Sequence, residues 1–277
     1  MALSTQRIDE LRALCQKFRI DLIRQLHSVQ TGHPGGSLSV CEILTVLYFE
    51  KAKVTPASPC DPSRDRIILS KGHAAPMLYR ILAEKGFFPH EDFAGLRRFG
   101  CHLQGHPCSK HTPGVEIPSG PLGLGLSAGI GMALSLRLSE NPARVYVVLG
   151  DGELNEGCVW EAAMSANKYK LDNLTAIVDY NHIQLDGTSD DIMPMGDLAA
   201  KWRAFGWEVV SCDGHNIAAI SNAIDICQRI EGRPAVILAE SVKGKGVSFM
   251  EGKNSWHGSP INDEQYAVAM EELGGTA

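Results

Sequence analysis

The sequence predicts an α/β fold in which a parallel β-sheet carries helices on both of its faces. Short apolar runs support this prediction, and they lie at residues 66–69, 145–149, 174–179, 207–211 and 235–240. Continuous apolar runs rich in β-branched residues are typical of strands that are buried on both faces. Helical segments separate the later runs, so right-handed crossovers would make the strands parallel. Such a sheet gathers the carboxyl ends of its strands at one edge, where ligands bind.

The N-terminal part of the chain predicts two helices. Between residues 5 and 30, apolar residues recur at helical spacing with charges between them: Leu11, Leu14, Phe18, Leu22 and Leu26. The segment TGHPGGS at 31–37 is expected to end this helix, because glycine and proline break helical periodicity. A second helix is expected over 38–49, and a loop over 56–65.

The middle of the chain alternates between helices and a long loop. Helices are expected over 73–85 and 124–138, the second of them glycine-rich and suited to close packing against a neighbour. Residues 100–121 are rich in glycine, proline and histidine and have little periodicity, and a loop of this length usually has a function or is disordered. Too few residues follow position 240 to build another sheet, so a single domain spanning 1–277 is expected.

Composition excludes several classes of function. The 277 residues are 44% apolar, which is enough for a large core, and 26 basic against 32 acidic residues give a net charge of -6. This sign does not favour nucleic-acid binding. No apolar run reaches membrane-spanning length, and the N-terminus is polar and unlike a signal peptide. The eight cysteines form no compact framework, which indicates reduced thiols and a cytoplasmic location.

Polar residues follow two of the predicted strands at the point where each strand ends. Gly150-Asp151-Gly152 follows one strand, and Asn181 follows the next strand along the chain. Consecutive units of an α/β sheet tend to be neighbours, so Asp151 and Asn181 are expected side by side at one edge. One carboxylate and one amide oxygen suit a hard cation such as Mg²⁺ that is shared with phosphate oxygens. Gly-Asp-Gly alone would indicate only a turn, but the pair at this spacing favours a metal site.

The segment from Gly150 to Asn181 resembles the diphosphate-binding motif of thiamine diphosphate enzymes, as do Ile183 and the Asp-Gly pair at 186–187. The resemblance implies a Mg²⁺ site, with Ca²⁺ or Mn²⁺ as substitutes. Its ligands would be Asp151, Asn181 and the backbone carbonyl of Ile183. Gly152 would contact the cofactor diphosphate.

Short histidine motifs narrow the resemblance to transketolases. They are TGHPGG at His33, SKGHAAP at His73, QGHP at His106 and SWHGSP at His257, in the order typical of that family. A single histidine is more often structural, and His27, His90 and His215 are interpreted in that way. By resemblance, His73 and His257 border the cofactor and the reaction centre, while His33 and His106 hydrogen-bond hydroxyls of the sugar donor. Imidazole suits these roles because it can donate, accept and exchange protons near neutral pH.

Two lysines and one loop complete the predicted cofactor site. Lys71 and Lys243 stand in glycine-rich segments near strand ends, where ammonium groups would offset the charge of a diphosphate. In transketolases the position matching Lys243 contacts the cofactor. Positions matching Gly120 and Leu122 meet it through the backbone. Gly36 departs from some relatives, which have a side chain near the cofactor at this position.

Three further patterns point less directly to a function. The segment GLGLSAG lacks the spacing of a dinucleotide-binding loop. The cluster Cys101, His102, His106, Cys108 and His111 contains no CxxC pair and fits no compact zinc site. Glu156 and Glu161 would be surface charges on a helix. In transketolases, however, the matching glutamates lie at the subunit interface between two active sites, which predicts a role in assembly.

The resemblance covers residues 12–260 and ends before the pyrimidine-binding and C-terminal domains of a transketolase. It implies the N-terminal subunit of a split enzyme, completed by a partner subunit in an α2β2 assembly. The implied reaction transfers a two-carbon ketol unit from a ketose phosphate to an aldose phosphate. The alternatives are a subunit of another thiamine diphosphate enzyme, such as one similar to 1-deoxyxylulose 5-phosphate synthase, and a non-catalytic cofactor-binding scaffold.

Overall fold

The computed structural model describes residues 3–276. At its centre lies a five-stranded parallel sheet. Its strands are β1 (Arg66–Leu69), β2 (Val145–Gly150), β3 (Leu174–Tyr180), β4 (Glu208–Asp213) and β5 (Ala235–Glu240). Their order is β1-β2-β3-β5-β4, and all neighbouring pairs are parallel. The predicted parallel sheet is therefore confirmed. The order also places β5 between β3 and β4, so β4 forms an edge and is the least buried strand.

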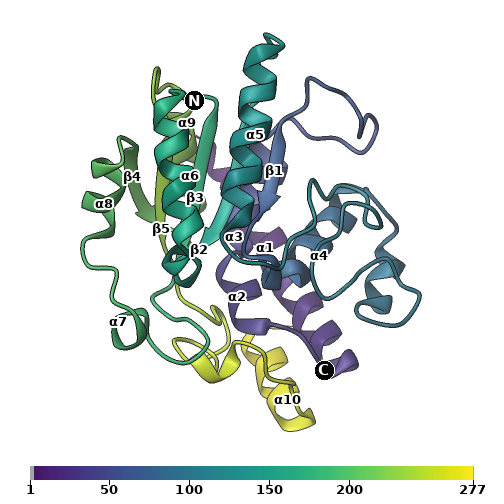
Figure 1. Ribbon diagram of the computed structural model, residues 1–277. Helices are drawn as coiled ribbons and strands as arrows, with labels where there is room; N and C mark the ends of the chain where they lie inside the picture. Colours follow the sequence, from purple (N-terminus) through teal and green to yellow (C-terminus); the bar gives the residue numbers. More distant parts are fainter. Residues whose placement is uncertain (1–2, 277) are drawn as a thin grey trace.

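Helices cover both faces of the sheet (Figure 1). They are α1 (Thr5–Val29), α2 (Pro34–Ser39), α3 (Cys41–Val46), α4 (Ala75–Lys85), α5 (Leu124–Leu138), α6 (Gly157–Lys168), α7 (Ser189–Ile192), α8 (Leu198–Ala204), α9 (Ile217–Cys227) and α10 (Asp263–Glu272). Short turns of other helix types are η1 (Leu47–Lys51), η2 (Gly72–Ala74), η3 (His90–Gly95), η4 (Gly152–Asn155) and η5 (Asn254–Trp256). One apolar core joins α1, α3, α4 and α9 to the sheet, and a second joins α5, α6 and α8 to the opposite face.

Successive strand residues divide between these two cores. In β2, Tyr146 and Val148 belong to the first core, whereas Val145, Val147 and Leu149 belong to the second. This division follows from the two-residue period of a strand, because alternate side chains point to opposite faces. The sheet is therefore buried on both sides, as its continuous apolar runs predict.

The segment TGHPGGS differs from the prediction. The chain leaves α1 at Val29 as expected, but a new helix already begins at Pro34, and α2, α3 and η1 form three short pieces in place of one helix over 38–49. Proline is well tolerated at the first turn of a helix, where its missing N–H has no partner to lose. Gly35 permits close packing, since a Cβ there would lie 2.8 Å from the carbonyl oxygen of Trp256. The predicted long loop over 100–121 does lack helices and strands.

The register of the sheet brings the predicted metal-binding segments together. Gly150 at the end of β2 pairs with Asp179 in β3, and Tyr180 pairs with Glu240 at the end of β5. Asp151 and Asn181 therefore emerge from adjacent strands at the same edge. In the described part of the chain, no helix combines the length and apolar character needed to cross a membrane.

Candidate active site

Most of the predicted cofactor residues line one cavity of about 160 Å³ at the carboxyl edge of the sheet. They come from segments far apart in the sequence: Lys71, His73, Leu122, Asp151, Gly152, Asn181, Ile183, Lys243 and His257. Gly36, Gly150 and Gly152 also line the cavity, so backbone can approach a ligand closely on several sides. The cavity thus brings together the groups that sequence motifs indicated one at a time.

Asp151 is a buried carboxylate with few partners. Its side chain is 2% exposed and accepts a hydrogen bond of 3.1 Å from the hydroxyl of Ser189. Burial raises the pKa of Asp151, and the nearby charge of Asp179 raises it further. A carboxylate in this situation gains from a bound cation, which would offset both effects.

Backbone geometry presents carbonyl groups to the same cavity. His182 adopts a left-handed conformation with φ of 62°, and the N–H of Ile183 donates to the Asn181 side chain over 3.2 Å. The ammonium of Lys243 donates to the carbonyl oxygens of Ile183, at 3.1 Å, and of Gln184, at 3.3 Å. A cationic group thus already bonds the Ile183 carbonyl that was predicted to hold the metal. This carbonyl, the Asp151 carboxylate and the Asn181 amide all offer oxygen atoms, which are the ligands that a hard divalent cation prefers.

Beneath the cavity lies an ion pair that sequence reasoning missed in part. The ammonium of Lys71 bonds the carboxylate of Asp179, and the two side chains are 1% and 0% exposed. Asp179 also accepts hydrogen bonds from the hydroxyls of Ser39, at 2.6 Å, and Ser241. Burial acts to raise the pKa of Asp179, but Lys71 and these hydroxyls outweigh it and hold the pKa below its usual value. The charge of Lys71 is thus largely committed within the chain. The one signal in the sequence was an aspartate inside the apolar run of β3.

Glu153 joins two of the predicted motifs and was also missed. Its carboxylate accepts hydrogen bonds from the N–H of Gly123, at 2.7 Å, the N–H of Gly150, at 3.0 Å, and the hydroxyl of Ser70. Gly123 ends the SGPLG loop, so this buried side chain fixes that loop against the turn after β2. Sequence reasoning passed over it because a glutamate after a turn is usually exposed.

The four motif histidines come together next to the cavity. Their ring centroids are 4.9 Å apart for His73 and His257, 5.5 Å for His33 and His257, 5.6 Å for His33 and His73, and 6.1 Å for His33 and His106. Gly120 packs beside this group, because a Cβ on it would lie 3.4 Å from the ring of His106. Histidines that are separated by more than two hundred positions in the sequence thus lie side by side in the fold.

Burial keeps these imidazoles neutral. It lowers the pKa of His33 to about 4 and of His257 to about 3, with nearby cations acting in the same direction. Burial also sets the pKa of His73 well below its usual value and lowers that of His106. The Nδ1 atom of His33 is buried and has no hydrogen-bond partner among the described residues. Neutral imidazoles with a free nitrogen can accept or donate a hydrogen bond to a ligand hydroxyl.

The loop that carries Lys243 is held by a buried network. The N–H of Val242 donates to Nε2 of His215 over 2.8 Å, and Nδ1 of the same ring lies 3.0 Å from Glu42. Arg19 bonds Glu42 and, through Nε, donates to the carbonyl of Lys245 over 3.1 Å. His215 is thus structural, as the sequence predicts, and it also positions a residue of the site.

Gly36 is explained by the packing of the site. A Cβ at this position would lie 3.0 Å from Nε2 of His73 and 3.5 Å from the Lys71 ammonium. A side chain could be accommodated only if His73 moved. Glycine at position 36 therefore leaves room for the imidazole in its observed place.

The remaining patterns have separate outcomes. Within residues 3–276, no three or more His, Cys, Asp or Glu side chains lie together in a group that could hold a metal ion. Glu156 and Glu161 are exposed at the start of α6. Their predicted role at a subunit interface stays a prediction.

Comparison with known proteins identifies the family. Residues 6–276 match the family model described as transketolase, thiamine diphosphate binding domain. The chain is 44% identical over 271 residues to a 6-deoxy-6-sulfo-D-fructose transketolase subunit from Clostridium sp. (strain MSTE9), covering 98% of each protein. It is 39% identical to an apulose-4-phosphate transketolase subunit from Phocaeicola vulgatus, covering 96% of this chain and 94% of that one.

Longer relatives are matched only in part. Human transketolase is 36% identical over 97% of this chain, which spans 42% of the human protein. A crystal structure of a Pichia stipitis transketolase in complex with sedoheptulose 7-phosphate has a TM-score of 0.91 at 29% identity, covering 96% of this chain and 41% of that one. The fold and the motifs therefore agree with one protein family along nearly the whole chain.

Proposed function

Because this chain belongs to the transketolase family, through its thiamine diphosphate-binding domain, we propose that it is the cofactor diphosphate-binding subunit of a two-subunit transketolase. The reaction is the transfer of a two-carbon ketol unit from a ketose phosphate, or a similarly anionic ketose, to an aldose phosphate. One observation carries the proposal. The chain is coextensive with relatives named as transketolase subunits and spans about two-fifths of the full-length enzymes.

The residues at the sheet edge fit the cofactor's diphosphate and its metal. When bound, thiamine diphosphate supplies an electron sink for cleavage of the carbon–carbon bond beside the ketose carbonyl. Asp151, the amide oxygen of Asn181 and the carbonyl of Ile183 would hold Mg²⁺, whose usual ligands are such oxygens together with phosphate. In that state the Lys243 ammonium would turn from the Ile183 carbonyl to the diphosphate. Gly152, and the backbone at Gly120 and Leu122, would approach it closely.

The histidines would orient the sugar and handle protons. His33 and His106 present neutral imidazoles that can hydrogen-bond donor hydroxyls, and the unpartnered Nδ1 of His33 supports this role. His73 and His257 stand between the cavity and that pair, where each can hold or pass a proton at a ring nitrogen. Their low pKa values favour the neutral form, which accepts a proton readily only when a nearby anion forms.

A partner protein would supply the rest of the active site. We propose a subunit that carries the pyrimidine-binding domain, an α2β2 assembly that forms in the cytoplasm, and an active site between the two kinds of chain. The exposed Glu156 and Glu161 on α6 are suited to that interface. The domain of 1–277 would act as one diphosphate-binding unit.

Reconstitution tests the proposal. The chain is combined with a candidate partner subunit that carries the pyrimidine-binding domain, and ketol transfer is measured with ketose phosphate donors, with and without thiamine diphosphate and Mg²⁺. Transfer is expected only when both proteins and both cofactors are present. Activity on a 2-oxoacid instead of a ketose would favour another thiamine diphosphate enzyme. Cofactor binding without turnover on any donor would favour a scaffold subunit.

A further inference from the structure

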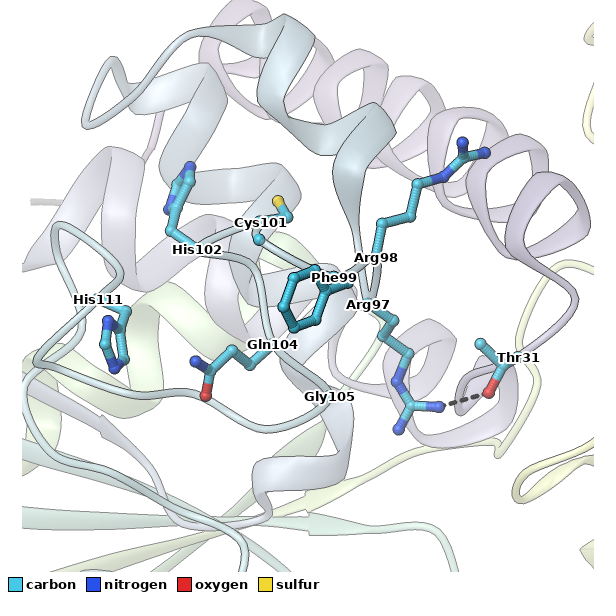
Figure 2. Close-up of a pocket in the computed structure, with 10 residues that line it drawn as sticks. Thr31, Arg97, Arg98, Phe99, Cys101, His102, Gln104, Gly105 and His111 are labelled. Carbon is cyan, nitrogen blue, oxygen red and sulfur yellow. Dashed lines mark hydrogen bonds between the residues drawn. The ribbon is translucent and has the colours of Figure 1, made fainter.

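The long loop over 100–121 borders two hollows outside the cofactor cavity. The first is the open hollow of Figure 2, which is lined by Thr31, His111 and the segment from Arg97 to Gly105. The second is a more enclosed cavity of about 190 Å³, lined in part by Ser109 and residues 112–116. This second cavity shares no lining residue with the cofactor cavity or with the open hollow, so neither the cofactor nor the motif histidines explain it.

The second cavity has largely apolar walls and a more polar mouth. Buried residues of its lining include Tyr48, Val54 and Ile67, and Phe87 adds a second aromatic ring. Its exposed lining residues come from two loops and mark the mouth: Pro59, Cys60, Ser109 and Pro113. An apolar cavity of about 150 Å³ is large enough to bind benzene, so the second cavity has room for a six-membered ring with one small substituent.

An ion pair fixes the two loops that border the cavity. The guanidinium of Arg64 bonds the carboxylate of Glu116 through both terminal nitrogens, with Nη2 at 3.0 Å, and its Nε donates to the carbonyl of Pro59 over 2.7 Å. The hydroxyl of Thr112 donates to the carbonyl of His102 over 2.7 Å. The walls are thus in place before a ligand binds, which lowers the entropy cost of binding. Because the two charged residues of the lining neutralise each other, the cavity favours an uncharged ligand.

Tyr48 presents a buried hydroxyl that lacks a partner. It stands in η1, a turn of π-helix, which is a rare geometry that is frequent at functional sites. The residue is 2% exposed, and in the described part of the chain no group is hydrogen-bonded to its hydroxyl. Burial raises the pKa of Tyr48, and the charge of Glu116 raises it further while that of Arg64 opposes it. The hydroxyl therefore lies near this ion pair and stays protonated, so it can donate a hydrogen bond to a ligand.

We infer that the second cavity is a binding site for a small, uncharged ring compound that carries one hydroxyl or carbonyl group, as phenol does. The ring would lie between the apolar walls, and its polar group would accept a hydrogen bond from Tyr48. The inference does not depend on the proposed transketolase function, because no residue of the cofactor cavity takes part. The loop segment that lines the second cavity lies between His106 and Gly120, so an occupant would contact the stretch that joins two motifs of the proposed active site.

Two fluorinated probes that differ by one hydroxyl test the site. 4-Fluorophenol and fluorobenzene are titrated into the 277-residue chain without cofactor or sugar, and binding is followed by ¹⁹F NMR. Wild type should bind both, with a Kd on the order of 1 mM or lower for 4-fluorophenol. Tyr48→Phe should raise the Kd of 4-fluorophenol about fivefold, the effect of one hydrogen bond, and leave that of fluorobenzene within about twofold. Tyr169→Phe is the matched control, because Tyr169 is 45% exposed and lies outside the cavity, so neither Kd should change.

Filling the cavity gives a second test that does not depend on the hydroxyl. Val115 lines the cavity, so Val115→Phe should occupy its volume and abolish binding of both probes. Val268→Phe makes the same change at a valine of α10 that is 44% exposed, and it should leave both Kd values within about twofold. Thermal unfolding shows whether each variant is folded. If Val115→Phe does not fold, the comparison of Tyr48→Phe with Tyr169→Phe decides.

Several results would overturn the inference. Absence of saturable binding of both probes to wild type would show that the cavity does not admit a ring. Equal weakening of both probes by Tyr48→Phe would show that the hydroxyl does not bond the ligand, and binding that persists in folded Val115→Phe would place the probes elsewhere. The titration is repeated after addition of the candidate partner subunit. Loss of 4-fluorophenol binding in that complex would assign the cavity to a side chain of the partner, whereas retained binding that Tyr48→Phe weakens supports the site.

Discussion

The two sides of the site are built differently, although they face the same small volume. At the sheet edge, Asp179, Glu153 and Lys71 are buried and bonded to groups of this chain. In the histidine group, the four imidazoles lie close together, yet the Nδ1 of His33 has no partner among the described residues. The charges at the sheet edge are therefore paired within the chain, whereas the histidine group leaves a buried nitrogen of His33 that a ligand can bond.

This difference separates stability from binding. Buried charges that are paired and hydrogen-bonded cost much if one member is removed. Buried polar groups without partners lower stability, because burial has removed their water, and they gain from a ligand that bonds them. Asp151 stands at the boundary, since it lies at the sheet edge but has the raised pKa of an unsatisfied group. Substitutions of the paired charges at the sheet edge should accordingly change mainly the free energy of unfolding, and substitutions of unpaired groups should change mainly the affinity for a ligand.

The largest effect is expected at Asp151. Asp151→Ala should abolish Mg²⁺-dependent binding of thiamine diphosphate, a loss of more than about a hundredfold in affinity measured by calorimetry. The free energy of unfolding of the metal-free chain should stay the same or rise, because burial and Asp179 already disfavour this carboxylate. Unchanged cofactor binding would refute the metal site. A large fall in the free energy of unfolding would show that Asp151 stabilises the fold, as Asp179 and Lys71 are expected to do.

The ion pair of Lys71 and Asp179 should show the opposite behaviour. Lys71→Met leaves a buried carboxylate without its cation and should lower the free energy of unfolding by about 3–5 kcal/mol in urea denaturation. Combining it with Asp179→Asn should recover part of that loss, since no unpaired charge then remains. The exposed pair of Arg12 and Asp9 is the control, where Arg12→Gln should cost less than about 0.5 kcal/mol. Equal effects at the two pairs would show that the buried one does not stabilise the sheet edge.

The sequence predicted the parts of the site that are local in the chain. The strand ends before Asp151 and Asn181 could be recognised in the sequence, because each buried apolar run stops at a polar residue. The histidines could be recognised because each stands in a short glycine-containing motif. These signals concern a few neighbouring residues, and the parallel sheet then brings them to one edge by a general rule.

The supporting residues could not be predicted in this way. Glu153 is hydrogen-bonded to Gly123, and Asp179 is hydrogen-bonded to Lys71 and Ser241. Each of these contacts joins residues 30 or more positions apart. Such contacts depend on strand order, and the insertion of β5 between β3 and β4 is what brings Ser241 beside Asp179. The close approach of Gly35 in α2 to the backbone of Trp256 is likewise a contact that no local propensity contains.

The histidine group should appear in the pH dependence of stability. The folded-state pKa of His257 is lowered to about 3, whereas the unfolded value is near 6.5, so unfolding takes up a proton between these limits. Its contribution to stability is present above about pH 6.5 and is lost as pH falls toward about 3. His257→Gln should therefore reduce proton uptake on unfolding near pH 5 by up to about one proton, measured by urea denaturation at several pH values.

Acidic groups do not obscure this result. The pKa values of Asp151 and Glu153 are raised in the folded state, so their contribution has the opposite sign and falls as pH rises. Both are present in wild type and in His257→Gln, and the difference between the two curves removes them. Superimposable curves would mean that His257 is not desolvated in the folded chain.

The smallest effect is expected at His215, which touches neither cavity but holds the loop of Lys243. Because its Nε2 accepts from Val242, its proton must be on Nδ1, facing Glu42. His215→Gln can keep an acceptor near the Val242 N–H, whereas His215→Asn is too short to reach it. Cofactor affinity should therefore fall about threefold to tenfold in the Asn variant and less in the Gln variant, with His27→Asn as a distant control. The same loss in both variants would assign the effect to the Glu42 contact, and no loss in either would show that Arg19 and Gly35 hold the loop without His215.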